Sequence, residues 1–192
     1  MRTYQSLIAG LLITLFALTN AIAGDLTTDD AKRVIAALED FKAYNTRHRD
    51  ADVSGLVPEG NPLTADSLNA DDGTPQIFRQ IADRLVFTPE MKTDFERRVL
   101  EDNGFQRKRD WAETTDAVFA AYLLLQVEDF EAPSNFPLTA EELAELPAEQ
   151  RPVVNALNQI VRLRKAVPPE NIEAVRPLAK EIERLDENWR GQ

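Results

Sequence analysis

Cysteine is absent from the 192 residues of this chain. The protein therefore has no disulfide, no thiolate nucleophile, no lipid attached through a cleavage-site thiol and no haem held by a Cys-x-x-Cys-His segment. Histidine occurs once, as His48, so a single imidazole would have to serve any catalytic triad. The Glu-x-x-His pairs of di-iron helical bundles are also missing. These absences exclude most familiar hydrolytic and redox sites.

Glycine is scarce, with 7 residues, and runs of β-branched residues are short. Apolar residues instead recur at spacings of three and four, which predicts helices throughout and no strand. Basic residues are also few, because 33 acidic residues stand against 22 basic ones and give a net charge of −11. Nucleic acids and anionic membranes are bound through dense basic faces, so both are poor partners for this chain.

The longest apolar run lies near the start, where residues 7–18 are almost unbroken in apolar character. Arg2 precedes this run, and Ala21-x-Ala23 follows it. A charged start, a short apolar centre and small residues at these two positions predict a secretory signal peptide at 1–23, cleaved after Ala23. The run is too short for a retained anchor, which needs about 20 apolar residues. We therefore expect a periplasmic protein with no stable membrane anchor after cleavage.

Residues 24–192 are enough for one domain with an ordinary core, and we predict an all-α, irregular bundle of five to seven helices. Capping patterns mark the expected helix starts at Thr27, Thr74-Pro75, Thr88-Pro89, Asp110 and Thr139. Expected stops or breaks lie at Asn103-Gly104, Leu146-Pro147, Pro168-Pro169 and Pro177. The helix from Trp111 to Val127 is apolar on all sides at 117–125, so we place it at the centre of the bundle.

Residues 50–73 form the longest segment without periodicity and are predicted to be an irregular loop. The loop opens like an EF-hand, because Asp50, Asp52 and Ser54 stand at the first three ligand positions and Gly55 at the turn position. Position 12 is Asn61, where one amide oxygen replaces the two charged oxygens of a glutamate. A weak calcium loop therefore stands against a simpler alternative, an acidic turn that caps the first helix.

A spaced pattern follows the predicted stop at residue 104: GF, five residues, W, four, D, one, V, two, AY. Its members are Gly104, Phe105, Trp111, Asp116, Val118, Ala121 and Tyr122. This pattern, together with VPPENIEAVRPL at 167–178, resembles small exported helical proteins of Gram-negative bacteria that have no assigned activity. The resemblance implies export and an all-helical fold, and it carries over no catalytic residue. The chain departs from it at Arg107, Lys108 and Arg109, where such proteins more often have polar or acidic residues.

The run Arg107-Lys108-Arg109, with Arg97 and Arg98 nearby, stands out in an acidic chain. It is either a docking spot for an anionic partner or a solvated corner balanced by Glu101 and Asp102.

His48 and Met91 are the only histidine and the only methionine after residue 23. A helical bundle could use such a pair to bind haem, but their spacing does not show that they meet. The simpler interpretation is a surface histidine and a core methionine.

The sequence assigns no catalytic, cofactor-binding or metal-ligating residue, and we do not expect an enzyme. We predict a non-catalytic protein-binding or accessory, chaperone-like protein, with an unknown protein partner. Its candidate contact surfaces are the 50–73 loop and the run Arg107-Lys108-Arg109, which we call the basic corner. The alternative is a periplasmic carrier of a small apolar ligand between helices, and an unrecognised enzyme is third. A filled core favours the first function, whereas an interior cavity of about 300 Å³ or more favours the second. The oligomeric state is left open.

Overall fold

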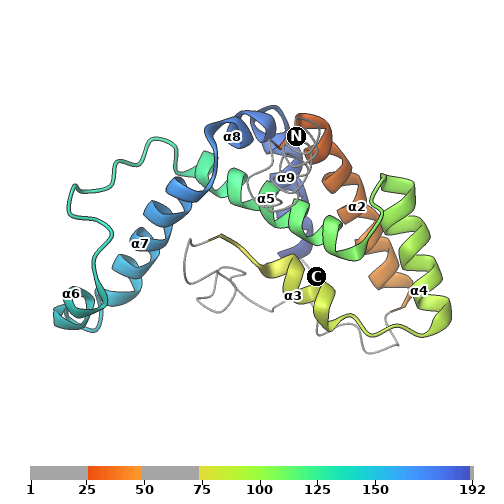
Figure 1. The fold of residues 1–192 in the computed structure, drawn as a ribbon, viewed down its shortest axis with the longest axis horizontal. Coiled ribbons are helices and arrows are strands. Elements are labelled where there is room, and N and C mark those ends of the chain that lie inside the picture. Colours follow the sequence, from red (N-terminus) through yellow and green to blue (C-terminus); the bar gives the residue numbers. More distant parts are fainter. Residues whose placement is uncertain (1–25, 49–73, 191–192) are drawn as a thin grey trace, which may run out of the picture.

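A computed structural model describes residues 26–48 and 74–190 of the chain, with side chains described as far as Leu185. The helices are α2 (Thr28–Arg47), α3 (Ile77–Arg84), α4 (Pro89–Phe95), the π-helix η3 (Glu96–Leu100), the 3-10 helix η4 (Glu101–Asn103), α5 (Lys108–Gln126), α6 (Ala140–Glu145), α7 (Arg151–Ala166), α8 (Pro169–Val175), the 3-10 helix η5 (Arg176–Leu178) and α9 (Ala179–Arg190) (Figure 1).

The predicted all-α class is confirmed, because the described ranges contain these helices and no strand. The described ranges hold seven continuous helical segments when the abutting α4–η3–η4 and α8–η5–α9 are each counted once, which agrees with the predicted five to seven. None of the described helices is both long and apolar enough to cross a bilayer. The predicted signal peptide at 1–23 and the predicted loop at 50–73 lie outside the described residues.

Helix α2 begins where its capping pattern predicts. The Thr27 hydroxyl accepts a hydrogen bond from the Asp30 backbone N–H at 3.1 Å, and the Asp30 carboxylate accepts one from the Thr27 backbone N–H at 3.0 Å. This reciprocal pair satisfies two amides that a helix start otherwise leaves without partners. The same arrangement of Thr139 and Glu142 starts α6, as predicted.

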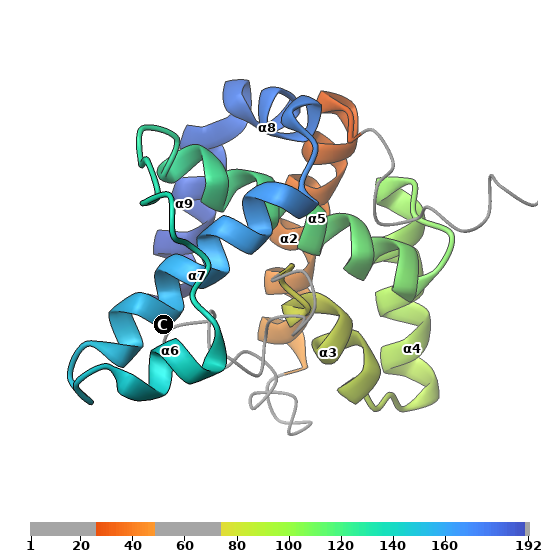
Figure 2. The same ribbon diagram turned by 60° about the vertical axis from the view of Figure 1, so that its left-hand side comes forward.

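Helix α5 occupies the centre of the fold, as predicted, and packs against α2, α3, α7 and α8 (Figures 1 and 2). Its first turns carry Trp111, which is fully buried. The indole lies at ring-centroid distances of 5.2 Å from Phe41, 5.8 Å from Phe78 and 5.7 Å from Phe95. Aromatic rings from four helices thus fill the middle of the core, where each buries a large apolar area.

Helix α3 corrects one prediction, because Thr74 and Pro75 do not start it. The helix begins at Ile77, and its N-cap residue Gln76 makes no side-chain capping bond. Asp116 of α5 takes that role, since its Oδ1 accepts from the Phe78 backbone N–H at 2.9 Å and its Oδ2 from the Arg79 backbone N–H at 3.2 Å. A carboxylate from another helix satisfies the free amides, so no local cap is required.

The stop at residue 104 is confirmed and has the geometry of a Schellman motif. Gly104 has φ of +74°, a left-handed conformation that glycine adopts without a steric cost. The Phe105 N–H donates to the Leu100 carbonyl at 2.9 Å, and the Gly104 N–H donates to the Glu101 carbonyl at 3.0 Å. Phe105 folds back beyond the glycine and is buried.

Residues 128–162 project from the rest of the molecule as a helical hairpin, which we call the arm (Figures 1 and 2). The arm comprises a linker at 128–139, α6, a turn at 146–150 and α7 as far as Arg162. The remaining described residues are called the body. Asn158 is the only buried residue of the arm, so the hydrophobic core of the described residues lies entirely in the body.

Candidate functional site

The basic corner is built differently from the sequence prediction. Helix α5 begins at Lys108, with Arg107 as its N-cap, so Asp110 is not the cap but belongs to the first turn. Cations at a helix N-terminus oppose the helix dipole by about 0.3–1 kcal/mol each. Here acidic residues one turn further along offset this cost. Arg107 donates from Nε and Nη2 to the Asp110 carboxylate at 2.9 and 2.6 Å, and Arg109 Nε donates to Glu113 at 2.7 Å.

Arg97 and Arg98 do not join this corner, because both turn to Asp94. Arg98 Nε lies 2.7 Å from Asp94 Oδ1, and Arg97 Nη2 lies 3.8 Å from the same atom. The balancing acids are therefore not Glu101 and Asp102, as the sequence suggested, but acids three or four residues from each arginine.

Lys108 alone in this set has no carboxylate partner among the described residues, and its Nζ lies 5.6 Å from the Phe87 ring centroid. The corner thus offers an anion one unpaired ammonium. The docking-spot hypothesis stays a prediction, with little charge to support it.

A hollow of about 510 Å³ lies beside the corner. Its lining residues are Phe87, Lys92, Phe95, Glu96, Leu100, Glu101, Gln106, Arg107 and Lys108. Five of these nine side chains carry charge, and an apolar ligand would have to remove them from water. The cavity between α3, α5 and the α7–α8 junction is far smaller, at about 30 Å³, and has room for about one water molecule. Neither space has the size and lining expected of an apolar carrier.

His48 and Met91 take separate structural places. His48 is the C-cap of α2, and its Nε2 lies 3.1 Å from Asp94 Oδ2 while its ring lies 4.7 Å from that of Tyr44. The side chain is 18% exposed, so it is more buried than the predicted surface histidine. Met91 is a core residue, as predicted. The contact with Asp94 engages Nε2, one of the two ring nitrogens through which an imidazole can bind a metal.

Several basic side chains contact the Asp94 carboxylate near the C-terminal end of α2. Arg47 donates to its Oδ2 from Nη2 at 3.0 Å, beside His48, and Arg98 donates to its Oδ1. Burial alone raises the pKa of Asp94, but the hydrogen bonds from His48 and Arg47 outweigh this effect and hold the pKa below its ordinary value. The carboxylate therefore stays charged near neutral pH and fixes the end of α2 to α4.

Asp116 is the carboxylate that most resembles a catalytic acid, because burial raises its pKa to about 6 although hydrogen bonds from the Phe78 and Arg79 amides pull the other way. Both of its oxygens are engaged, however, and Arg79 Nε adds a bond to Oδ2 at 3.2 Å. The adjoining space is the cavity of about 30 Å³. These contacts give Asp116 a complete structural explanation as the cap of α3.

The search for metal ligands covers only the described part of the chain. Within 26–48 and 74–185, no group of three or more His, Asp or Glu side chains is arranged to hold a metal ion. The candidate calcium ligands Asp50, Asp52 and Ser54 lie outside the described residues.

The arm is the feature that the sequence analysis did not single out. Its helix α7 ends at Ala166 and carries an apolar stripe of Val153, Val154, Leu157, Ile160 and Val161. In the structure none of these five side chains is buried, and Val153 is 63% exposed. Linker and helix are joined by Asn158, whose Oδ1 accepts from the Leu138 N–H at 2.7 Å and whose Nδ2 donates to the Leu138 carbonyl at 2.9 Å.

One sequence signal could have identified the arm. Residues 128–150 contain seven acidic and no basic residues, whereas residues 151–166 contain four basic and no acidic residues. Such a division of charge is unusual beside a helix whose apolar stripe would otherwise mark it as a core element.

No protein-family model, curated protein or solved structure matches the chain. The resemblance to small exported helical proteins therefore stays a prediction. The residues of its spaced pattern have structural places in this fold: Gly104 ends a helix in the left-handed conformation, and the other six are buried.

Proposed function

We propose that this protein is a non-catalytic interaction protein of the cell envelope, accessory or chaperone-like in role, and that the arm binds its protein partner. The observation that carries the proposal is the exposed state of the arm. From residue 128 to residue 162 only Asn158 is buried, although α7 keeps a continuous apolar stripe.

The apolar side chains of the arm are only partly buried. Ordering a residue costs about 1–2 kcal/mol of backbone entropy, and burial of apolar side chains is the main compensation. The arm orders its backbone without burying any apolar side chain fully. A partner laid along the stripe supplies that burial, in the way that amphipathic helices commonly recognise a partner.

The body supports binding rather than catalysis. Aromatic side chains pack against Trp111 in its core, and its buried carboxylate Asp116 caps α3 with both oxygens. The space beside this carboxylate, about 30 Å³, is too small for a substrate.

The carrier of a small apolar ligand is the second candidate, and the hollow of about 510 Å³ favours it by volume. Its charged lining, which includes Lys92, Glu96 and Glu101, speaks against an apolar ligand.

A site-specific photo-crosslinking residue at Val153 tests the proposal in cells that produce the protein. The matched control places the same residue at Glu181, which is exposed on α9 of the body. We expect a discrete protein adduct from position 153 and none from position 181. Organic extraction of the purified protein tests the carrier in parallel. Absence of an adduct at 153, with a bound lipid in the extract, would replace the proposed function with the carrier.

A further inference from the structure

We propose that the partner on the arm is a second copy of this chain, with two arms paired antiparallel so that the acidic tip of each lies against the basic base of the other. The tip is defined by Glu141, Glu142, Glu145 and Glu149, and the base by Arg162, Arg164 and Lys165. This inference rests on the proposed function, because it names the partner of the same surface.

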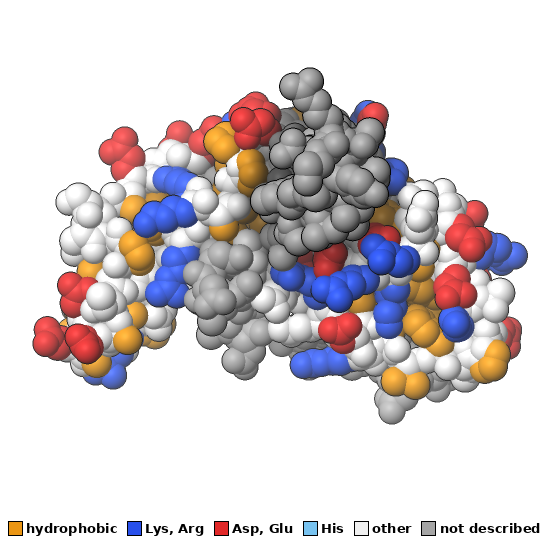
Figure 3. All heavy atoms as spheres, in the orientation of Figure 1, with side chains coloured by type: hydrophobic (Ala, Val, Ile, Leu, Met, Phe, Trp, Pro, Cys, Tyr) orange, Lys and Arg blue, Asp and Glu red, His pale blue; other side chains and the backbone are white. Residues whose placement is uncertain are grey.

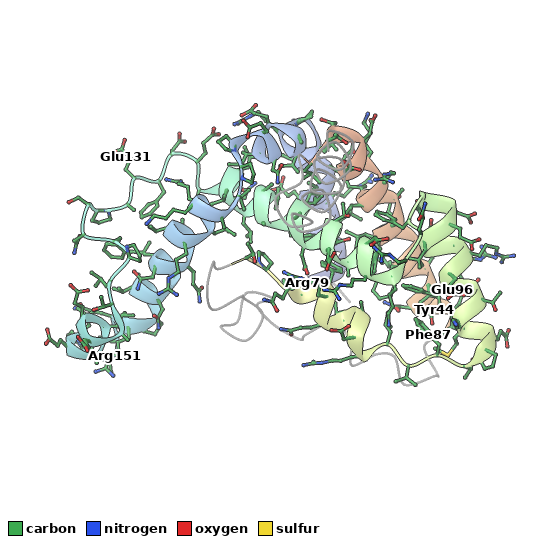
Figure 4. All side chains as sticks on the ribbon, viewed as in Figure 1. Tyr44, Arg79, Phe87, Glu96, Glu131 and Arg151 are labelled. Atoms are coloured by element: carbon green, nitrogen blue, oxygen red, sulfur yellow. The ribbon has the colours of Figure 1, made fainter. Side chains whose placement is uncertain are left out.

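Opposite charges lie at the two ends of the arm. All the residues of the tip and of the base are exposed. In Figure 3 acidic side chains gather at the free end of the arm, while basic side chains lie between that end and the body. Arg151 also lies at the tip (Figure 4), so four acids against one base leave the tip at −3. Glu131 points outward from the linker, away from α7 (Figure 4).

The acidic side chains of the tip form no salt bridge with another described residue. Among the described residues the only salt bridge of the arm joins Glu128 to Arg176 of the body at 2.7 Å. Two arginines of α7, Arg151 and Arg164, donate to carbonyl oxygens instead. Arg151 donates to Ala144 and Leu146, and Arg164 donates to Val127 and Phe130. The carboxylates of Glu141, Glu145 and Glu149 therefore remain available to cations of another molecule, while Glu142 also accepts hydrogen bonds from Thr139 at the start of α6.

The apolar stripe gives the pairing its geometry. Helix α7 has 16 residues and is about 24 Å long, with Leu157 near its middle. A two-fold axis close to Leu157 places the apolar stripe of α7 in one copy against the same stripe in the other copy. It also brings the tip of each arm to the base of the other. A parallel pairing would instead bring the two acidic tips together. Charge thus selects the antiparallel arrangement, which is also the closed, isologous arrangement of most homodimers.

The pairing surface is narrow, because a helix is about 10 Å wide and only α6 and the linker flank α7. An interface of this size lies at the low end of stable protein interfaces. We therefore expect reversible dimerisation with a dissociation constant on the order of 1–100 µM.

Charge reversal followed by mixing tests the inference on the full exported chain, with sedimentation equilibrium as the readout. The tip variant is E141K/E145K, and the base variant is R162E/K165E. Each variant alone brings like charges together, so we expect its dissociation constant to rise at least tenfold. In an equimolar mixture the basic tip of one variant meets the acidic base of the other, and the basic base meets the acidic tip. We expect the mixture to associate nearly as tightly as the wild type.

The control variant E170K/E181K reverses two exposed charges on the body and should leave the dissociation constant within twofold. Circular dichroism verifies that all variants keep their helicity. A wild-type chain that stays monomeric at 100 µM, or a mixture that does not associate, overturns the inference.

The crosslink at Val153 separates this failure from that of the proposed function. An adduct of twice the chain mass supports the second copy. An adduct with a different protein, from a chain that is monomeric alone, overturns the second copy and keeps the proposed function. A monomeric chain with no adduct overturns both.

Discussion

Replacing Asp116 tests how the central helix holds α3 in place. In the Asp116→Ala variant the backbone amides of Phe78 and Arg79 lose their acceptor, and Arg79 Nε loses a partner at 3.2 Å. Hydrogen bonds to a charged group contribute about 1.5–3 kcal/mol each, while removal of the buried charge returns part of that sum. We expect the free energy of unfolding at pH 7 to fall by about 3 kcal/mol.

The pH dependence gives the sharper test. The pKa of Asp116 is raised from 3.8 to about 6, chiefly by burial, so between these values the folded chain holds a proton that the unfolded chain releases. The resulting stabilisation is fully present below pH 3.8 and is lost as the pH rises through about 6. The full pKa shift corresponds to about 3 kcal/mol of stabilisation. About 2 kcal/mol of this stabilisation is lost between pH 4 and pH 7.

The matched variant is Asp116→Asn, which has nearly the same shape and does not titrate. Urea denaturation followed by the fluorescence of Trp111 and Trp189 gives the free energy of unfolding of both proteins. Other groups titrate alike in the two, so they cancel in the difference. We expect the wild type to gain about 2 kcal/mol relative to the variant when the pH is lowered from 7 to 4. A constant difference, or a loss, would show that Arg79 and the amides compensate the buried charge completely.

Two further substitutions test other parts of the fold. Gly104→Ala should lower the free energy of unfolding by about 1–2 kcal/mol, because φ is +74° and the added Cβ meets Arg33 only at an ordinary 3.5 Å. An unchanged melting temperature would contradict this backbone cost. Asn158→Ala should speed amide exchange at 130–146 at least tenfold while α5 stays protected, because the side chain holds both polar groups of Leu138. Equal acceleration in arm and body would show that the two unfold together.

Local signals predicted much of the helical structure. The starts of α2 and α6 follow from Thr27 with Asp30 and Thr139 with Glu142, because a capping box needs only residues three apart. The stop at Gly104 follows from the freedom of glycine at positive φ.

The two errors in the helix starts arose where the predicted capping residue did not take the capping role. Thr74 looked like the cap of α3, but Asp116 supplies the carboxylate from 38 positions away from Phe78. Asp110 looked like the cap of α5, but its carboxylate accepts two hydrogen bonds from Arg107, and the helix starts earlier, at Lys108. The contact of Asp116 with α3 is not visible from spacing, because the partners are 38 positions apart.

The candidate site shows the same division. The sequence by itself determined that α7 is amphipathic and that acidic and basic residues separate along 128–166, because periodicity and charge are properties of neighbouring residues. Whether an apolar stripe is covered depends on which other elements reach it, and only the tertiary structure decided this. In the structure the buried core lies in the body around Trp111, whereas the apolar stripe of α7 lies on a projecting arm and is only partly buried.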